Sequence, residues 1–287
     1  MRWFRAPAKI NLHLRVLARR LDGLHEIESL VAFSEIGDWV GYQPGERLEL
    51  DVEGPTALEA GPPEQNLVLK AARALAARIP NLMLGRFRLV KRLPAAAGVG
   101  GGSSDAAAAL AALAEANGLP QEDERLRAAA EETGADVPAC LFPGARWVQG
   151  VGERVGAPVA LPEMFAVLAN PRVPAPTRDV FEALGLVPGS PFDFPGEQGL
   201  AAGSAAVSFE ALLSARNDLQ AAAIRVVPAV ESTLEALARL PGARVARMTG
   251  SGATCFALFD SALGAATACR TVAAERPQWW VRATSLR

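Results

Sequence analysis

Residues 92–110 read RLPAAAGVGGGSSDAAAAL. Four glycines lie within five positions: Gly98, Gly100, Gly101 and Gly102. Two serines and an aspartate follow, and then an alanine-rich run. Glycine lets a ligand approach the backbone and permits positive φ, and consecutive amides of such a loop can form an anion-binding nest. A helix predicted over residues 105–117 adds free N–H groups and the positive end of its dipole. The segment therefore predicts a loop that holds a di- or triphosphate.

The residues after the glycines narrow the kind of phosphate site. Ser103 and Ser104 can cap the helix or offer hydroxyls to a phosphate or a metal. The P-loop GxxxxGK[ST] is excluded because Gly102, and not a lysine, precedes Ser103. The dinucleotide-binding fingerprint is excluded because Ser103 stands at its sixth place. It also requires an N-terminal βαβ unit with an acidic residue about 20 positions on, and the acidic residues there lie in a predicted polar helix. A flexible surface loop before a capped helix is the alternative, although a linker would not be flanked by a strand and an alanine-rich helix.

The composition restricts the class of protein. The 287 residues suffice for two domains and a large core. With 31 acidic residues against 29 Lys plus Arg, the formal net charge is −2, so we expect no nucleic-acid partner. No apolar run reaches the roughly 18 residues of a membrane span, and the N-terminus lacks the apolar core of a signal peptide. Three cysteines without a CxxC pair, and only two histidines, favour a reduced, cytoplasmic setting without a transition-metal site.

The first half alternates strands and helices. Residues 8–17, AKINLHLRVL, alternate cleanly, which predicts a strand with one buried face and with Lys9 and Asn11 on the other. Asn66 is placed to cap a helix that runs to Ile79. Other elements are expected as strands at 29–42, 47–53 and 86–93, a helix at 121–133 and a hairpin at 145–155.

The pattern restarts near Leu161-Pro162. A stretch rich in Gly, Pro and Ala, residues 185–205, predicts a long surface loop. Helices on mostly antiparallel strands in both halves indicate an α+β protein. The elements expected here are strands at 165–169, 244–249, 254–260 and 279–284, and helices at 208–225, 228–240 and 261–275.

These motifs, in this order, resemble those of the GHMP kinases, which phosphorylate small molecules with ATP. PAAAGVGGGSSDAA resembles the phosphate-binding motif of the family. Six further segments resemble the branch that acts on cytidine diphosphate methylerythritol in non-mevalonate isoprenoid synthesis: APAKINLHL, RRLDGLHEIESL, EQNLVLKAA, GADVPACL, NDLQ and MTGSGATCFALF. The resemblance covers most of the chain.

The resemblance implies the two-domain GHMP kinase fold. We expect an N-terminal ATP-binding α+β domain over residues 1–158 and a ferredoxin-like C-terminal domain over residues 159–287. It implies phosphoryl transfer from ATP, with Mg²⁺, to a hydroxyl of 4-diphosphocytidyl-2-C-methyl-D-erythritol, a small-molecule substrate. A GHMP kinase of homoserine or mevalonate type, and a nucleotide-binding homologue without catalysis, are the alternatives.

Two charged residues match the catalytic positions of the family. Asp136, in GADVP, matches the aspartate that accepts the proton of the attacking hydroxyl. Lys9 matches the lysine that opposes the negative charge around the transferred phosphoryl group. Taken alone, Asp136 could merely cap the turn ahead of Pro138, and Lys9 could be a solvated lysine on a strand.

The resemblance also assigns the binding positions. Phosphate and nucleotide binding falls to Pro94, Gly98, Gly100, Gly101, Gly102, Ser103, Ser104, Asn66 and Lys91, with Ser104 as a magnesium ligand. Substrate binding falls to Asn11, Leu24, His25, Thr177, Phe181, Gly250, Ser251 and Gly252. The alternatives are structural: Asn66 as a helix cap, Lys91 as a strand-edge lysine, and residues 250–252 as a tight turn.

The chain departs from the family pattern at two places. Leu24 stands in DGLH where the family usually has a tyrosine that stacks on the cytosine. Leucine can cover a base face but has no π system, so Phe181, in the matching place of the second domain, is the expected stacking partner. His13 stands where the family usually has an apolar residue.

Overall fold

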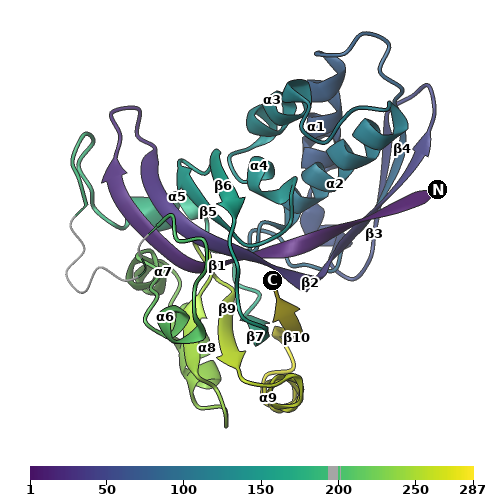
Figure 1. Ribbon diagram of the computed structural model, residues 1–287. Coiled ribbons are helices and arrows are strands. Elements are labelled where there is room, and N and C mark those ends of the chain that lie inside the picture. The colour runs from purple at the N-terminus through teal and green to yellow at the C-terminus, as the bar shows by residue number, and fades with distance from the viewer. Residues whose placement is uncertain (193–199, 201) are drawn as a thin grey trace. The chain divides into compact units, whose positions relative to one another are not determined.

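The computed structural model describes residues 1–192, 200 and 202–287 (Figure 1). Its contacts divide the chain into two units. Unit 1 comprises Met1–Lys9, Gly37–Ala95 and Gly100–Pro143, and unit 2 comprises Ile10–Ile36, Ala96–Val99 and Gly144–Arg287. Strands β1 (Arg2–Arg19) and β2 (His25–Pro44) run through both units. Each unit therefore consists of several separate segments rather than one continuous half of the sequence, and the domain boundary at residue 158 stays a prediction.

Unit 1 combines a small sheet with a group of helices. Strand β3 (Glu49–Glu53) pairs parallel with β4 (Gly85–Val90), which pairs antiparallel with the end of β2. The four α-helices pack on one another, as Figure 1 shows: α1 (Leu67–Ala76), α2 (Gly101–Ala116), α3 (Glu124–Thr133) and α4 (Val137–Cys140). Two short 3₁₀ helices precede α1, η1 (Ala57–Ala60) and η2 (Pro63–Gln65). Six of the ten buried residues of α2 are alanines, whose small side chains allow neighbouring elements to approach closely.

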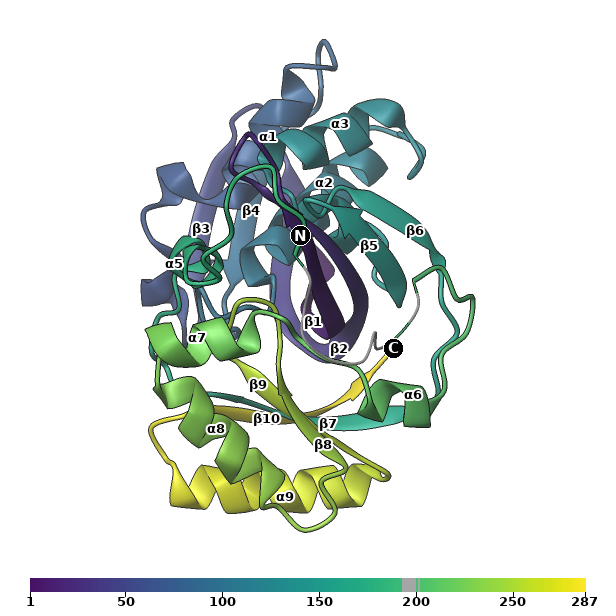
Figure 2. The same ribbon diagram turned by 90° about the vertical axis from the view of Figure 1, so that its left-hand side faces the viewer.

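Unit 2 contains a five-stranded antiparallel order, β2-β10-β7-β9-β8. Its C-terminal strands are β7 (Met164–Asn170), β8 (Val245–Met248), β9 (Cys255–Phe259) and β10 (Trp280–Leu286). Helices α8 (Ala229–Ala238) and α9 (Ala262–Glu275) pack against this sheet, on the same side in Figure 2. The order β10-β7-β9-β8 with a helix before β8 and another after β9 is the β-α-β-β-α-β arrangement of ferredoxin-like domains, as predicted.

The remaining elements of unit 2 include the predicted hairpin. Strands β5 (Arg146–Gly150) and β6 (Arg154–Pro158) pair with each other, and β5 pairs with the start of β2. Helix α5 (Thr177–Glu182) follows β7. The single helix predicted over residues 208–225 is wrong, because α6 (Phe209–Leu213) and α7 (Gln220–Val226) are separated by a segment that hydrogen-bonds to β1, with Leu14 N donating to Arg216 O.

The loop predicted over residues 185–205 lies partly outside the described residues, which omit 193–199 and 201. Its first part follows the end of β1, where Gly189 N donates to Arg19 O and Phe192 N donates to Leu17 O. In the part of the chain that the structure describes, no helix is long and apolar enough to cross a membrane.

Candidate active site

The glycine segment enters helix α2 earlier than predicted. The helix begins at Gly101 and not at residue 105, and Gly100, with φ of 61°, is its N-cap. A side chain at this left-handed position would be strained, and a Cβ added there would lie 3.2 Å from Lys9 Cβ. The prediction that Ser103 or Ser104 caps the helix is wrong, because both serines lie inside it and no side chain caps it. The first backbone N–H groups of α2 have no acceptor within the helix and carry the positive end of its dipole.

Ser104 lies in the interior of unit 1. Its hydroxyl donates to Pro7 O over 2.7 Å and lies 3.4 Å from Cys140 Sγ, and the residue is 2 % exposed. Burial raises the pKa of Cys140 to about 12, so this thiol is protonated at neutral pH. A buried hydroxyl that already donates within the protein does not fit a magnesium ligand. Ser103, one residue earlier, is only half-buried.

Lys9 and Asp136 contact each other. Lys9 Nζ donates to Asp136 Oδ1 over 2.6 Å, and the Lys9 side chain is 6 % exposed whereas that of Asp136 is 44 % exposed. Asp136 precedes α4 but makes no capping hydrogen bond, so the alternative of a mere cap is excluded. A carboxylate that is oriented by a buried ammonium and open on its other side can accept a proton from a bound molecule.

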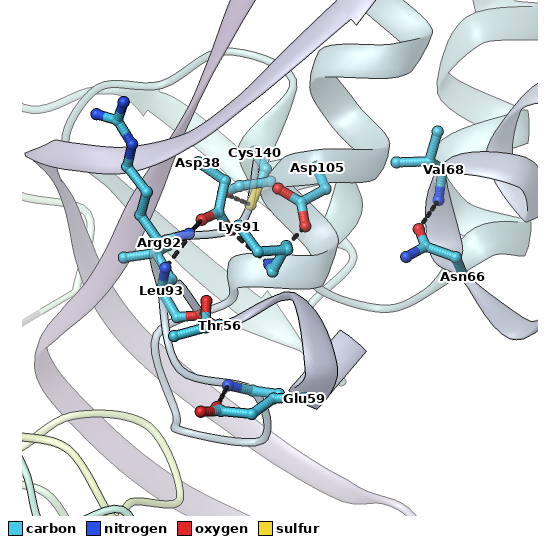
Figure 3. A network of polar contacts seen from close by, with 12 residues as sticks. Asp38, Thr56, Glu59, Asn66, Val68, Lys91, Arg92, Leu93, Asp105 and Cys140 are labelled. Atoms are coloured by element: carbon cyan, nitrogen blue, oxygen red, sulfur yellow. Dashed lines mark hydrogen bonds and ion pairs between the residues drawn. The ribbon is translucent and has the colours of Figure 1, made fainter. Parts of the chain in front are cut away.

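A second lysine of unit 1 is enclosed by two carboxylates. Lys91 Nζ lies 2.5 Å from Asp38 Oδ2 and 2.7 Å from Asp105 Oδ2 (Figure 3). Asp38 Oδ1 also accepts the backbone N–H groups of Arg92 and Leu93. None of the three charged side chains is more than 5 % exposed. The ammonium of Lys91 is therefore occupied within the protein, and the predicted nucleotide contact at this position would have to use its backbone.

This triad, Asp38–Lys91–Asp105, holds two carboxylates against one ammonium. Burial disfavours the charge on Lys91, but Asp105 and Asp38 more than offset it, so the pKa of Lys91 lies above its usual value. Burial raises the pKa of Asp105 to about 8, opposed by the attraction of Lys91 and aided by the repulsion of Asp38. Asp105 Oδ1 has no hydrogen-bond partner among the described residues. The raised pKa favours a proton on Asp105 at neutral pH, which relieves the excess of carboxylates over ammonium in the triad.

Asn66 caps helix α1. Its Oδ1 accepts the backbone N–H of Val68 over 3.0 Å, as Figure 3 shows, so the structural alternative for this residue is confirmed. The predicted nucleotide contacts of Asn66 and Pro94 stay predictions; Pro94 is buried.

In unit 2, several residues predicted to bind phosphate or substrate meet at the turn between β8 and β9. We call residues 249–252 the second glycine loop. Thr249 Oγ1 accepts the backbone N–H of Asn11 over 2.9 Å, and Ser251 Oγ lies 2.9 Å from Thr177 Oγ1. A Cβ added to Gly250 would lie 2.7 Å from Gly98 O. Asn11, Gly98 and Thr177, far apart in sequence, thus meet at one loop, which does more than reverse the chain.

Only one of the two polar groups of the Asn11 side-chain amide has a hydrogen-bond partner in the described part of the chain. Its Nδ2 donates to Ser29 Oγ over 2.7 Å, whereas its buried Oδ1 has no partner in the described part of the chain. An amide oxygen without a partner is an acceptor for a hydroxyl. The predicted contact of Asn11 with a substrate hydroxyl remains a prediction.

Two of the residues predicted to bind the cytosine base, His25 and Phe181, contact each other. The rings of His25 and Phe181 lie with their centroids 4.7 Å apart and their planes inclined by 31°. A base could not lie between rings at this separation, because contacting carbon atoms lie about 3.5–4.0 Å apart. Leu24, in contrast, is 52 % exposed. Burial and the charge of Arg19 lower the pKa of His25, so its imidazole is neutral at neutral pH.

Sequence reasoning did not find Asp38, Thr249 or Asn217. Asp38 alternates with two buried residues of β2, Val40 and Tyr42, so the period of two placed its carboxylate on the buried face. That signal was available in the sequence. Thr249 and Asn217 lie in the quoted motifs MTGSGATCFALF and NDLQ, but their hydrogen bonds depend on strand order, so the motifs did not show their roles.

Two family models match this chain, one in its first half and one in its second. The GHMP kinases N terminal domain model matches residues 66–144, and the GHMP kinases C terminal model matches residues 201–277. The 4-diphosphocytidyl-2-C-methyl-D-erythritol kinase of Xanthobacter autotrophicus is 53% identical over 287 residues, which cover 99% of this chain and 98% of that protein. The protein of the same name from Methylobacterium radiotolerans is also 53% identical, with the same coverage.

Solved structures show the same fold. A crystal structure of 4-(cytidine 5'-diphospho)-2C-methyl-D-erythritol kinase matches with a TM-score of 0.78 and 33% identity and covers 99% of both chains. Homoserine kinase from Cytophaga hutchinsonii matches with a TM-score of 0.70 at 17% identity, covering 98% of this chain and 93% of that one, a likeness of fold alone. With both family models matched and relatives this similar over nearly its whole length, the chain belongs to the GHMP kinase family.

Proposed function

We propose that this GHMP kinase transfers the γ-phosphoryl group of ATP to a hydroxyl of 4-diphosphocytidyl-2-C-methyl-D-erythritol, giving the 2-phosphate and ADP. The reaction would serve non-mevalonate isoprenoid synthesis, in the cytoplasmic setting expected from the sequence. The observation that carries the proposal is the ion pair of Lys9 and Asp136, in contact over 2.6 Å. Gly100, the N-cap of α2, lies against Lys9 in the same unit, so the pair and the start of the helix are neighbours.

The residues supply what phosphoryl transfer to an alcohol needs. The hydroxyl oxygen of the substrate attacks the γ-phosphorus, the bond from that phosphorus to the β–γ bridging oxygen breaks, and the hydroxyl proton passes to Asp136. Lys9 orients this carboxylate and opposes the negative charge on the group in transfer. The free N–H groups at the start of α2 are suited to phosphate oxygens.

Magnesium would accompany the nucleotide. Among the described residues, no group of three or more His, Cys, Asp or Glu side chains could hold a metal ion, and the Ser104 hydroxyl is occupied. This fits an ion that takes most of its ligands from phosphate and water, with the half-buried Ser103 as the better serine candidate. When bound, the ion neutralises phosphate charge.

Substrate choice is supported by the relatives and by the unit 2 residues around His25. The neutral imidazole can accept or donate at a base edge, and the exposed Leu24 is free to cover a base. Asn11 Oδ1 offers an acceptor for a hydroxyl of the substrate.

A panel of acceptors tests the proposal. Purified protein with ATP is offered the cytidine diphosphate compound, homoserine and mevalonate in separate reactions, and ADP release and the phosphorus NMR spectrum of each product are measured. We expect ADP and a new phosphomonoester signal with the cytidine diphosphate compound alone. Phosphorylation of homoserine or mevalonate instead would refute the substrate, and ATP binding without turnover on any acceptor would favour a non-catalytic homologue.

A further inference from the structure

The motif NDLQ, residues 217–220, resembles a motif of the family, but none of its residues has yet been assigned a function. In unit 2 it begins in a segment between α6 and α7 that lies along β1. Leu14 N donates to Arg216 O over 2.8 Å, and Asp218 N donates to Leu14 O over 3.0 Å. Asp218 Oδ2 accepts the backbone N–H of Val16 over 2.9 Å. Residues 216–218 are therefore fixed to β1 from both ends.

His13 adds a contact to the same segment. Its Nδ1 accepts the backbone N–H of Arg216 over 3.1 Å, which requires a neutral ring with the proton on Nε2. Burial, and then the charges of Arg216, Arg247 and Arg15, lower the pKa of His13 to about 4, so the ring is neutral at physiological pH. The histidine that departs from the family pattern thus holds the NDLQ segment in place.

Asn217 and Gln220 connect this segment to the end of β8. Strand β8 is at the edge of its sheet, and the backbone of Met248 faces away from β9. Asn217 Nδ2 donates to Met248 O over 2.8 Å and to Gly250 O over 2.9 Å. Gln220 Oε1 accepts Met248 N over 3.0 Å. Two side-chain amides therefore replace the missing neighbour strand at the point where the second glycine loop begins.

The backbone shape of the second glycine loop affects Gly98, in the glycine-rich segment before α2. Gly250 has φ of 55°, and its α-carbon is so close to Gly98 that a Cβ would lie 2.7 Å from Gly98 O. Thr249 Oγ1 also donates to Gly98 O, over 3.3 Å. A change in the backbone at Gly250 would move the atoms that touch Gly98.

We propose that Asn217 is a positioning residue of the kinase, whose side-chain amide holds the second glycine loop in the shape that meets Gly98. Asn217 is 7 % exposed and its Oδ1 accepts Leu219 N over 3.0 Å, so the orientation of the amide is fixed and its two donor hydrogens point to the two carbonyls. The kinetic consequences rest on the proposed function; the effect on the loop does not.

Aspartate at this position separates the donor from the size of the side chain. Asn217→Asp keeps the volume and the acceptor for Leu219 N but turns a carboxylate oxygen toward two carbonyl oxygens, which it cannot satisfy. Asn170→Asp is the matched control, because buried Asn170 Nδ2 donates over 2.9 Å to Thr254 Oγ1, a hydroxyl that can turn and donate to a carboxylate. Both variants bury one new carboxylate in unit 2.

Amide hydrogen exchange and steady-state kinetics are measured on the full chain of each variant. For Asn217→Asp we expect faster exchange at residues 248–252 and a KM for the cytidine diphosphate compound raised about tenfold, with a smaller change in kcat. Lowering the pH should reduce the KM defect relative to wild type, because a protonated carboxyl regains one donor. Asn170→Asp should match wild type in both measurements. If Asn217→Asp does not fold, Asn217→Ser, which keeps one donor, should show the same changes in smaller degree.

The outcomes separate the inference from the proposed function. Unchanged exchange at residues 248–252 in Asn217→Asp, or a KM like that of wild type, overturns the positioning role. Faster exchange there, in a protein whose wild type does not phosphorylate the cytidine diphosphate compound, supports the positioning of the loop and refutes the proposed function.

Discussion

Lys9 and Lys91 lie in the same unit, are equally buried, and each contacts aspartate, yet their surroundings differ. The partner of Lys9 is one carboxylate, Asp136, whose side chain is 44 % exposed. Lys91 is held between Asp38 and Asp105, whose side chains are 0 % and 3 % exposed. The first pair presents an open carboxylate to solvent, whereas the second is closed on every side that the structure describes.

The difference shows how one residue type is given two tasks. A buried ion pair is compatible with a stable fold only when both partners are present, because removing one leaves an uncompensated charge away from water. A pair with one open member has a free lone pair for a substrate proton. We therefore assign the chemistry to Lys9 and Asp136, and assign the closed triad to holding β2, β4 and α2 together within unit 1.

Asp136→Asn should have the largest effect, on kcat. The amide keeps the size of the side chain but cannot accept the proton, so kcat should fall by about 10²- to 10⁴-fold while thermal unfolding changes little. The measurement is ADP release at saturating substrates. Asp51→Asn is the control, because Asp51 forms an exposed ion pair with Arg86 over 2.7 Å, and its loss should leave kcat unchanged. A kcat within twofold of wild type in Asp136→Asn would remove it as the base.

Lys91→Met should have its main effect on stability. The variant removes the ammonium that both buried carboxyl groups contact, so the free energy of unfolding should fall by about 3–5 kcal/mol. Lys9→Met leaves its partner half in water, so the loss should be under about 1 kcal/mol, with kcat strongly reduced. Denaturant unfolding of both variants measures the contrast. If Lys9→Met were the less stable of the two, the roles assigned to the lysines would be reversed.

The strand that carries Lys9 and the nearby helix could be predicted because their signals are local, whereas the pairing of Lys9 with Asp136 followed only from the family resemblance. The period of two in residues 8–17 placed Lys9 and Asn11 on one face of a strand, and the glycines marked the start of a helix. Asn66, directly before an amphipathic helix, was recognised as a cap. Each of these inferences uses residues within a few positions of one another.

The Lys91 side could not be predicted, because its partners are distant in sequence. Asp38 reaches Lys91 only because β2 pairs with β4 in the register that places Trp39 opposite Val90. Nothing in either segment shows which strand it pairs with. The break between α6 and α7 has the same origin, since residues 216–218 give up helical hydrogen bonds for contacts with Leu14 and Val16 of β1. Local sequence patterns therefore predict neither the pairing of β2 with β4 nor the break between α6 and α7.

The sharpest test of the closed triad is the pH dependence of the stability to which it contributes. In the folded chain burial raises the pKa of Asp105 from 3.8 to about 8, so between these values the folded state keeps a proton that the unfolded state has released. Stability from this group is therefore present at low pH and is lost as the pH rises through that window. Asp105→Asn cannot ionise and keeps an oxygen for Lys91 Nζ.

Melting temperatures of wild type and Asp105→Asn should accordingly agree only near pH 4 or below, and the variant should become the more stable as the pH rises towards 8. Taking the difference between the two proteins cancels the contribution of His13, which both contain. Asp38→Asn should destabilise at both pH values, because the amide keeps only one of the two oxygens that accept Lys91 Nζ and two backbone N–H groups. An Asp105→Asn protein less stable than wild type at both pH values would mean that both carboxylates are charged, and the triad would then carry a net negative charge beside the start of α2.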